Sequence, residues 1–311
     1  MSPIVELRDI TKVFPGVVAN DRISIKFYPG EVHALLGENG AGKTTLMNIL
    51  YGLYPPDGGQ IFVRGKPVEL KSPTDALACG IGMVHQHFML VPPFTVAENI
   101  ILGSEPKRHR FFLDMERAVA DVEALSSRYG LKVDPRAKIQ DISVGMQQRV
   151  EILKALYRGA EVLILDEPTA VLTPQEVDEL REITDNLAKQ GKAVIFITHK
   201  LQEVMAMSQR ITVIRAGKVV GTVATASTNP VELARMMVGR DVVLKVDKEP
   251  VAAGPVLLAV EDVWADDDRR LPALRGLNLQ VRSGEIVGIA GVDGNGQREL
   301  AEVLVGTRPA K

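Results

Sequence analysis

Short apolar runs alternate with helical patterns through most of the chain. Residues 81–84, 162–165 and 193–197 are apolar or small throughout, as is typical of strands that are covered on both faces in a parallel sheet. Between such runs, apolar residues recur every three or four positions, as Val177, Leu180, Ile183 and Leu187 do, and this spacing predicts amphipathic helices. The pattern therefore predicts an α/β fold with a mostly parallel sheet.

The two ends of this region predict short strands joined by turns. Strands are expected at 4–7 and 23–27, at 60–63 and 68–70 around a turn at 64–66, and at 211–214 and 218–223 around a turn at 216–217. Phe14 stands among small and polar neighbours. Its ring is either a minor core residue or, if it is exposed near a ligand, a platform for a flat base.

From about residue 88 to residue 159 the pattern is helical, which predicts an inserted helical subdomain. Thr95 and Glu98 have the spacing of a capping box, in which each side chain bonds the backbone N–H of the other residue. Ser143 precedes a helical repeat that ends at Gly159. Two interpretations of Ser143 to Gly145 stay open: an ordinary helix cap, or a helix N-terminus that presents its hydroxyl and N–H groups to an anion.

One stretch between the apolar run 32–36 and a helical pattern has a specific chemical meaning. Its spacing is G-x-x-x-x-G-K-T, a phosphate-binding loop. Inward N–H groups, the N-terminus of the next helix and the charge of Lys43 suit a triphosphate, while Thr44 would place a hydroxyl on Mg²⁺. A plain glycine-rich turn is the alternative. The stretch consists of Gly37, Glu38, Asn39, Gly40, Ala41, Gly42, Lys43, Thr44 and Thr45.

Polar side chains follow three of the predicted buried strands. Asp166 and Glu167 end one strand, His199 ends another, and Gln86 follows a third. Ligands bind at such strand ends in doubly wound sheets. Asp166 would hold Mg²⁺ through water, Gln86 would reach the metal or a water, and Glu167 would act as general base on an attacking water. A structural ion pair is the alternative for the two carboxylates.

The composition narrows the class of protein. A formal net charge of −2 and a pI near 6.3 give no basic field, so nucleic acid is not expected as a partner. No apolar run approaches about 18 residues and the first ten residues do not read as a signal peptide. We therefore expect a cytosolic chain whose membrane link comes through a partner. The single cysteine, Cys79, excludes an internal disulfide.

Together these motifs resemble an ATP-binding cassette (ABC) ATPase over residues 4 to about 240. Gly37–Thr44 matches Walker A, 163–167 matches Walker B, Gln86 the Q-loop and His199 the switch histidine. The signature motif is matched by Ser143, Val144, Gly145, Met146 and Gln147. The resemblance implies a P-loop NTPase core with an antiparallel β subdomain and an inserted helical one.

The resemblance also implies ligands and roles. ATP and Mg²⁺ are the expected cofactors, with Thr44, Gln86 and Asp166 at the metal. Phe14 becomes the ring that stacks on adenine, and Gln86 the sensor that joins the nucleotide to the helical subdomain. His199 would contact the γ-phosphate. The signature would act on ATP held by an opposing unit, so turnover should be weak unless two chains pair.

Two positions depart from the family's usual pattern. The signature usually reads Ser-Gly-Gly-Gln, and here Val144 and Met146 are substitutions. The D-loop usually ends in Asp, and here Thr173 stands in that place. Threonine is a good helix cap and a poor partner for a salt bridge, so communication across a dimer is expected to change.

Residues from 256 onward repeat the beginning of the chain. Gly291 to Arg298 mirror the phosphate-binding loop at an offset of 254 residues, with Gln297 in the place of Lys43 and Arg298 in that of Thr44. We expect this copy to bind ATP poorly. The expected organisation is a first ABC domain at 1–243, a linker at 244–255 and a C-terminally truncated second domain at 256–311. So short a unit is expected to be poorly ordered or to pack on the first.

Tandem cassettes of this kind resemble the ATPase subunits of importers for monosaccharides and nucleosides, and residues 83–90 and 143–150 are closest to the nucleoside branch. The resemblance implies two transmembrane permease subunits, an extracytoplasmic substrate-binding lipoprotein and a second ABC unit as partners, at the cytoplasmic face of the membrane. A ribose or galactose importer is the alternative. A soluble ABC-type switch on ribosomes or DNA is disfavoured by the near-neutral charge.

Overall fold

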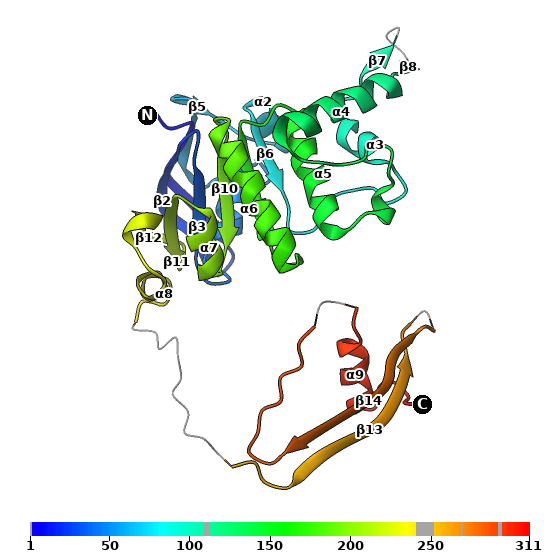
Figure 1. Cartoon of the computed structure of the whole chain (residues 1–311). Helices are drawn as coiled ribbons and strands as arrows, with labels where there is room; N and C mark the ends of the chain where they lie inside the picture. The colour runs from blue at the N-terminus through cyan, green and yellow to red at the C-terminus, as the bar shows by residue number, and fades with distance from the viewer. Residues whose placement is uncertain (1, 109–111, 241–251, 269, 292–293) are drawn as a thin grey trace. The chain divides into compact units, whose positions relative to one another are not determined.

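The computed structural model describes residues 2–108, 112–240, 252–268, 270–291 and 294–311. The chain divides into two compact units, Met1–Leu244 and Lys245–Lys311 (Figure 1). Most of the predicted linker, residues 244–251, lies outside the described residues. The domain bounds given above stay a prediction, and each unit is described by itself.

A six-stranded sheet with the order β12-β11-β3-β10-β9-β6 forms the centre of the first unit. All neighbours in it pair in parallel except the edge pair β11 and β12. Every residue of β3, β6, β9 and β10 is buried, as the continuous apolar runs predicted. The strands are β3 (Val32–Leu36), β6 (Ile81–Val84), β9 (Val162–Asp166), β10 (Ala193–Thr198), β11 (Arg210–Arg215) and β12 (Lys218–Ala224).

Helices cover one face of this sheet, and a helix together with a second sheet covers the other. Alternate residues of β10 face the two cores: Phe196 packs in a cluster with residues of the helices α5 to α8, and Ile195 in a cluster with α1 and the second sheet. The helices outside the insertion are α1 (Lys43–Leu50), α2 (Pro73–Ala78), α6 (Pro174–Lys189), α7 (Leu201–Met207) and α8 (Pro230–Val238), with the short 3-10 helix η2 (Thr225–Ser227) before α8.

The second sheet of this unit is antiparallel, in the order β2-β1-β4-β5. Its strands are β1 (Val5–Phe14), β2 (Val17–Phe27), β4 (Gly58–Val63) and β5 (Lys66–Val68). β1 and β2 are much longer than the strands expected at 4–7 and 23–27. The register of β1 shifts between Leu7 and Ile10 and again between Ile10 and Lys12, and such bulges break the alternation by which a strand is recognised.

The helical insertion contains α3 (Val96–Ile101), α4 (Met115–Tyr129), the 3-10 helix η1 (Ile139–Asp141) and α5 (Val144–Tyr157). The capping box of Thr95 and Glu98 is confirmed at the start of α3. A short hairpin of β7 (Lys107–Arg108) and β8 (Phe112–Leu113) extends from the insertion (Figure 1). The sequence did not predict it, because strands of two residues have no recognisable period.

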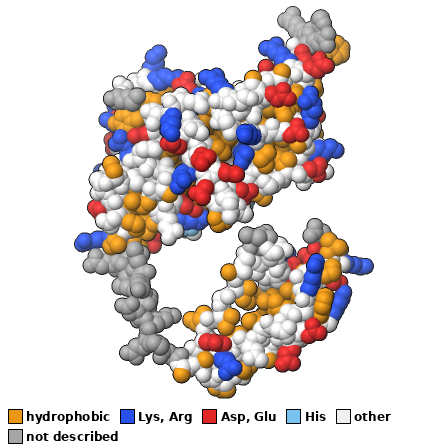
Figure 2. Space-filling view, viewed as in Figure 1, with side chains coloured by type: hydrophobic (Ala, Val, Ile, Leu, Met, Phe, Trp, Pro, Cys, Tyr) orange, Lys and Arg blue, Asp and Glu red, His pale blue; other side chains and the backbone are white. Residues whose placement is uncertain are grey.

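The second unit pairs β13 (Val256–Asp266) with β14 (Pro272–Arg282) and adds α9 (Gln297–Leu304). Ala265, Leu274 and Leu300 form its small core. Residues 286–290, which mirror β3, form no strand in the described part of the unit. In the first unit β3 is held between β10 and β11, and the described residues of the second unit form no strand in their place. Figure 2 shows hydrophobic side chains gathered on the second unit. Two of its hydrophobic residues, Leu257 and Ile286, are 72% and 87% exposed.

Candidate functional site

The loop from Gly37 to Gly42 joins β3 to α1 by a tight turn. Gly42 is the N-cap of α1, and its φ of 98° lies in the left-handed region that favours glycine. A Cβ atom at Gly42 would lie 2.2 Å from the carbonyl oxygen of Ala19. The buried Asn20 donates from Nδ2 to the Gly42 carbonyl at 3.0 Å. The loop is therefore fixed against β2, and α1 begins with its N-terminus at the loop.

Lys43 is buried, and its ammonium lies within the loop. Nζ donates to the carbonyl oxygens of Gly37 at 2.7 Å and Glu38 at 2.9 Å. Burial lowers the pKa of Lys43, while the negative charges of Glu167 and Asp166 act in the opposite direction. A positive charge and the first N–H groups of α1 thus meet at one place, which is an environment for an anion.

Asp166 is only 6% exposed at the end of β9. The Thr44 hydroxyl donates to its Oδ1 over a long 3.5 Å. Burial and then the charge of Glu167 raise the pKa of Asp166 to about 6, against the effect of Lys43 and Thr44. This excess of negative charge, together with a hydroxyl and a carboxylate oxygen as donors, fits a hard divalent cation such as Mg²⁺.

Glu167 and His199 meet at the same edge of the sheet. Oε1 of Glu167 lies 3.1 Å from Nδ1 of the exposed His199. The backbone N–H of Glu167 donates to the Ile197 carbonyl at 3.0 Å. Its φ is 45°, a strained value for a residue with a Cβ atom, and such strain gathers at functional sites. The carboxylate is partly exposed, so a water can reach it.

One recess, which we call the loop recess, is lined by residues of β1, of β2, of the loop with the start of α1, and by the residue that follows β9. They are Phe14, Val17, Ala19, Asn39, Gly40, Ala41, Gly42, Lys43, Thr44, Thr45 and Glu167, around a volume of about 410 Å³. The ring of Phe14 packs edge-on against Tyr54 with 5.7 Å between centroids. The loop recess is therefore bordered by a flat ring, a turn of N–H groups, an ammonium and a carboxylate.

Two groups of predicted site residues lie elsewhere. Gln86 is exposed after β6, and within the described residues no hydrogen bond joins it to Lys43, Thr44 or Asp166. The signature residues begin α5 and are not among those that line the loop recess. There the Ser143 hydroxyl accepts the N–H of Met146 at 3.3 Å, as the helix-cap interpretation predicted, and Gln147 donates to the Ile142 carbonyl at 3.3 Å.

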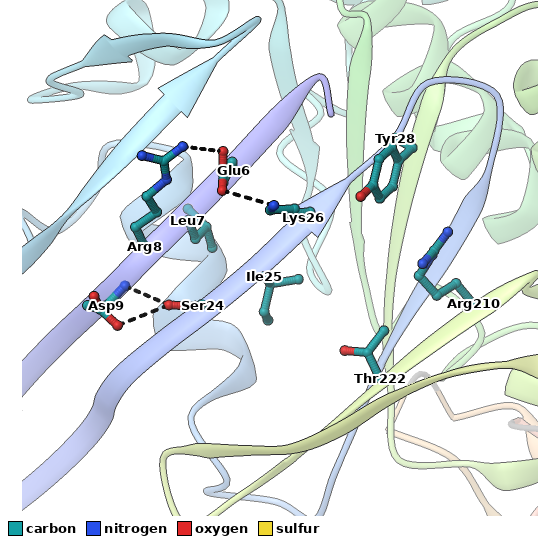
Figure 3. Close-up of a pocket in the computed structure, with 10 residues that line it drawn as sticks. All are labelled: Glu6, Leu7, Arg8, Asp9, Ser24, Ile25, Lys26, Tyr28, Arg210 and Thr222. Atoms are coloured by element: carbon teal, nitrogen blue, oxygen red, sulfur yellow. Dashed lines mark hydrogen bonds and ion pairs between the residues drawn. The ribbon is translucent and has the colours of Figure 1, made fainter. Parts of the chain in front are cut away.

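A slightly larger hollow, of about 450 Å³, lies over β1 and β2 (Figure 3). Its charged groups already have partners, within the hollow for Glu6, Arg8, Lys26 and Asp9, and at Glu31 beside it for Arg210. Glu6 accepts from Arg8 at 2.8 Å and lies 3.4 Å from Lys26, while Asp9 accepts from Ser24 at 3.1 Å. No turn of N–H groups from a helix start borders it in the part of the chain described. We therefore place the candidate site at the loop recess.

Two polar residues at the site escaped the sequence analysis. Asn20 holds the loop at Gly42. Glu203 of α7 accepts hydrogen bonds from Thr169 at 2.7 Å and Thr198 at 3.0 Å, and so connects the segment that follows β9 with the end of β10. No motif marks either residue. In β2, Asn20 is followed directly by the polar residues Asp21 and Arg22, so its residue type gave no signal of its role.

The fold and the site define the class of protein. Residues 20–170 match the family model described as "ABC transporter", and the first unit is an ATP-binding cassette of that family with its P-loop NTPase fold. A solved structure, the ADP conformation of an ATP-binding cassette of an ABC transporter, covers 77% of this chain and 100% of its own at a TM-score of 0.67 and 22% identity. That similarity shows the fold.

Curated relatives match nearly the whole chain. It is 56% identical to the guanosine import ATP-binding protein NupO of Bacillus subtilis (strain 168), over 99% of this chain. It is 53% identical to the nucleoside import ATP-binding protein NupA of Lactococcus lactis subsp. cremoris, over 97%, and 50% identical to the glucose import ATP-binding protein TsgD13 of Haloferax volcanii, over 98%. The chain spans about 60% of the length of each. Among the described residues, no helix is both long and apolar enough for a membrane span.

Proposed function

We propose that this chain binds ATP with Mg²⁺ and hydrolyses it to drive the import of nucleosides. The observation that supports this most is the loop recess, because it joins Phe14, the loop around Lys43 and Glu167. A base can stack on the ring, phosphates can accept from the loop and the ammonium, and water can meet the carboxylate.

Each residue of the candidate site has a separate proposed role. Lys43 and the N–H groups of residues 39–45 hold the β- and γ-phosphates, and Phe14 stacks on adenine. Glu167 orients the attacking water and accepts its proton. His199, which is 3.1 Å from Glu167, contacts the γ-phosphate and fixes the carboxylate.

Thr44 and Asp166 are the proposed ligands for Mg²⁺, with Gln86 as a third residue that reaches it when the segment after β6 moves. The ion supplies positive charge to the phosphate oxygens. The donor oxygens and the negative charge around Asp166 fit this role. Gln86 then also reports the bound nucleotide to the helical subdomain.

The complete site needs a second unit. Ser143 to Gln147 lie outside the loop recess, so their proposed role is to contact ATP that is held by an opposing unit. One copy is expected to bind ATP but to turn it over slowly, and two paired copies to turn it over faster.

In the transporter, two transmembrane permease subunits are the proposed partners, and an extracytoplasmic lipoprotein delivers the substrate to them. The ATPase would act at the cytoplasmic face of the membrane. NupO and NupA, whose names give guanosine and nucleosides as cargo, support nucleosides. A monosaccharide is the second candidate, because TsgD13 is named for glucose import and is 50% identical.

Uptake in cells tests the cargo. Labelled nucleosides and labelled ribose and glucose are supplied to cells in which the gene has been deleted, with the intact gene restored as control. Loss of nucleoside uptake alone supports our proposal, and loss of sugar uptake alone moves the chain to the sugar importers. Unchanged uptake of all of them contradicts both, whereas ATP binding by the purified chain is tested separately by calorimetry.

A further inference from the structure

One carboxylate joins the start of α5 to the start of α6. Oε1 of Glu176 accepts the N–H of Gly145 at 3.2 Å and lies 3.5 Å from the Ser143 hydroxyl. Its Oε2 accepts the N–H of Thr173 at 3.0 Å and the Thr173 hydroxyl at 3.2 Å. A single side chain thus connects the signature turn with the residue that ends the D-loop.

Gly145 makes this contact possible. A Cβ atom there would lie 2.4 Å from Oε1 of Glu176, closer than any real contact. One turn further along both helices, Arg149 forms an ion pair with Glu179. The approach of Glu176 to α5 is therefore part of a continuous contact between the two helices.

The carboxylate occupies the position of an anion at a helix N-terminus. α5 is 14 residues long, and negative charge is favoured at the N-terminus of such a helix. The donors that Glu176 meets, the hydroxyl of Ser143 and the N–H of Gly145, are those which one of the two interpretations in the sequence analysis offered to an anion. Among the described residues, the anion at these donors is the carboxylate of Glu176.

We propose that Glu176 is a built-in competitor for the phosphate of ATP at the signature turn. This inference rests on the proposed function, in which ATP held by one copy meets the signature of a second copy. The γ-phosphate and the carboxylate are both negative and need the same donors, so Glu176 must leave Gly145 before two copies can close around ATP. Its bonds to Thr173 use the other oxygen and can persist, so the movement carries the D-loop with it.

The test measures how tightly two copies pair in the presence of ATP. The 311-residue chain carries Glu167→Gln to slow hydrolysis, and sedimentation velocity gives the dissociation constant of the pair. Glu176→Gln is added because glutamine can still cap Thr173 but has no charge. Glu98→Gln is the matched control, since Glu98 makes the same capping box with Thr95 at 2.7 and 2.8 Å on α3.

We expect Glu176→Gln to tighten ATP-dependent pairing by about tenfold or more, because a like charge a few ångströms from the phosphate is removed. Glu98→Gln should leave pairing unchanged. Equal or weaker pairing in Glu176→Gln, or no pairing in any variant, overturns the proposal. ATP binding to dilute single copies is measured alongside by calorimetry, and only its absence in the parent chain contradicts the proposed function.

Discussion

At the scale of single residues, the loop recess is unbalanced in charge. Lys43 faces the two carboxylates Asp166 and Glu167, and burial lowers the pKa of Lys43 while it raises that of Asp166 to about 6. Both shifts mean that these residues are less well solvated than they would be in water. A ligand that brings negative charge to Lys43 and positive charge to the two carboxylates is therefore bound favourably, and a nucleotide with its cation is such a ligand.

Replacement of Lys43 by Met is expected to lower the affinity for ATP about 10- to 100-fold, since a charge-assisted hydrogen bond is worth about 1.5–3 kcal/mol. Among the described residues that line the recess, Lys43 is the one cation. Titration calorimetry gives the affinity. Lys26→Met serves as control, because Lys26 lies on β2 beside Glu6. Unchanged affinity in Lys43→Met would place the phosphates elsewhere.

Glu167→Gln should keep ATP binding and lower phosphate release about 10²- to 10⁴-fold, the usual contribution of a general base. The amide keeps the shape of the side chain but cannot accept a proton. Steady-state phosphate release at saturating ATP measures this. A variant that turns over at the parent rate would leave Glu167 as a structural partner of His199.

The sequence predicted the site residues whose roles depend on residues close to them along the chain. The glycine and lysine spacing of residues 37–44, and the carboxylates at the end of an apolar strand, are local patterns. The contact of Glu176 with Gly145 joins residues 31 positions apart, and that of Asn20 with Gly42 joins residues 22 apart. Nothing in a single sequence marks such pairs, because they depend on how the elements pack.

At the scale of elements, the end of β1 is held by the turn that follows α1. Lys12 donates to the Pro55 carbonyl at 2.8 Å and to Asp57 at 3.0 Å, and Asp57 also accepts the N–H of Val13 at 2.7 Å. Phe14 is the next residue, and its ring meets Tyr54 of the same turn. The turn therefore sets where the proposed base platform lies.

Asp57→Ala should weaken the binding of ATP about threefold to tenfold, since aromatic packing of a ring is worth about 0.5–1.5 kcal/mol. Inorganic tripolyphosphate has no base, so its affinity should not change. Competition of both ligands against a fluorescent ATP analogue gives the two constants. A parallel loss for tripolyphosphate would mean that Asp57 supports the loop rather than the base platform.

β3 carries a buried histidine that connects it with β11 and, through β11, with the edge strand β12. Nε2 of His33 lies 2.7 Å from the hydroxyl of Thr212, which in turn lies 2.8 Å from that of Thr222. Nδ1 lies 3.4 Å from Glu31, which is paired with Arg210. Thr222 and Arg210 both reach the surface hollow of Figure 3.

Burial lowers the pKa of His33 from its ordinary 6.5, against the effect of Glu31. Between the two values the unfolded chain binds a proton that the folded chain does not, so stability falls as the pH drops below about 6.5. Urea unfolding at pH 7.5 and pH 5.5 should show a smaller difference in His33→Gln than in the parent. Equal differences in both chains would assign the pH dependence to other groups.

At the scale of the whole molecule, the two units repeat the same local geometry. α1 and α9 each have eight residues and follow a glycine with a φ of 98° and 88° respectively. The sequence predicted this repeat, because the repeat consists of short local motifs. It did not predict that residues 286–290, the counterpart of β3, would form no strand, because a parallel strand forms only where its neighbouring strands are present. Residues Val292 and Asp293 of the second loop lie outside the described part of the chain.

We expect two copies of the chain to cooperate in ATP hydrolysis. Because the signature turn lies outside the loop recess of its own copy, the rate of ATP hydrolysis per chain should rise with chain concentration and then reach a plateau as pairs form. A mixture of Lys43→Met chains with chains that carry Gly145→Ala should be more active than either alone, since one mixed pair keeps an intact loop opposite an intact signature. Phosphate release over a hundredfold range of concentration measures both effects. A rate per chain that is independent of concentration would mean that a single copy hydrolyses ATP with its own residues.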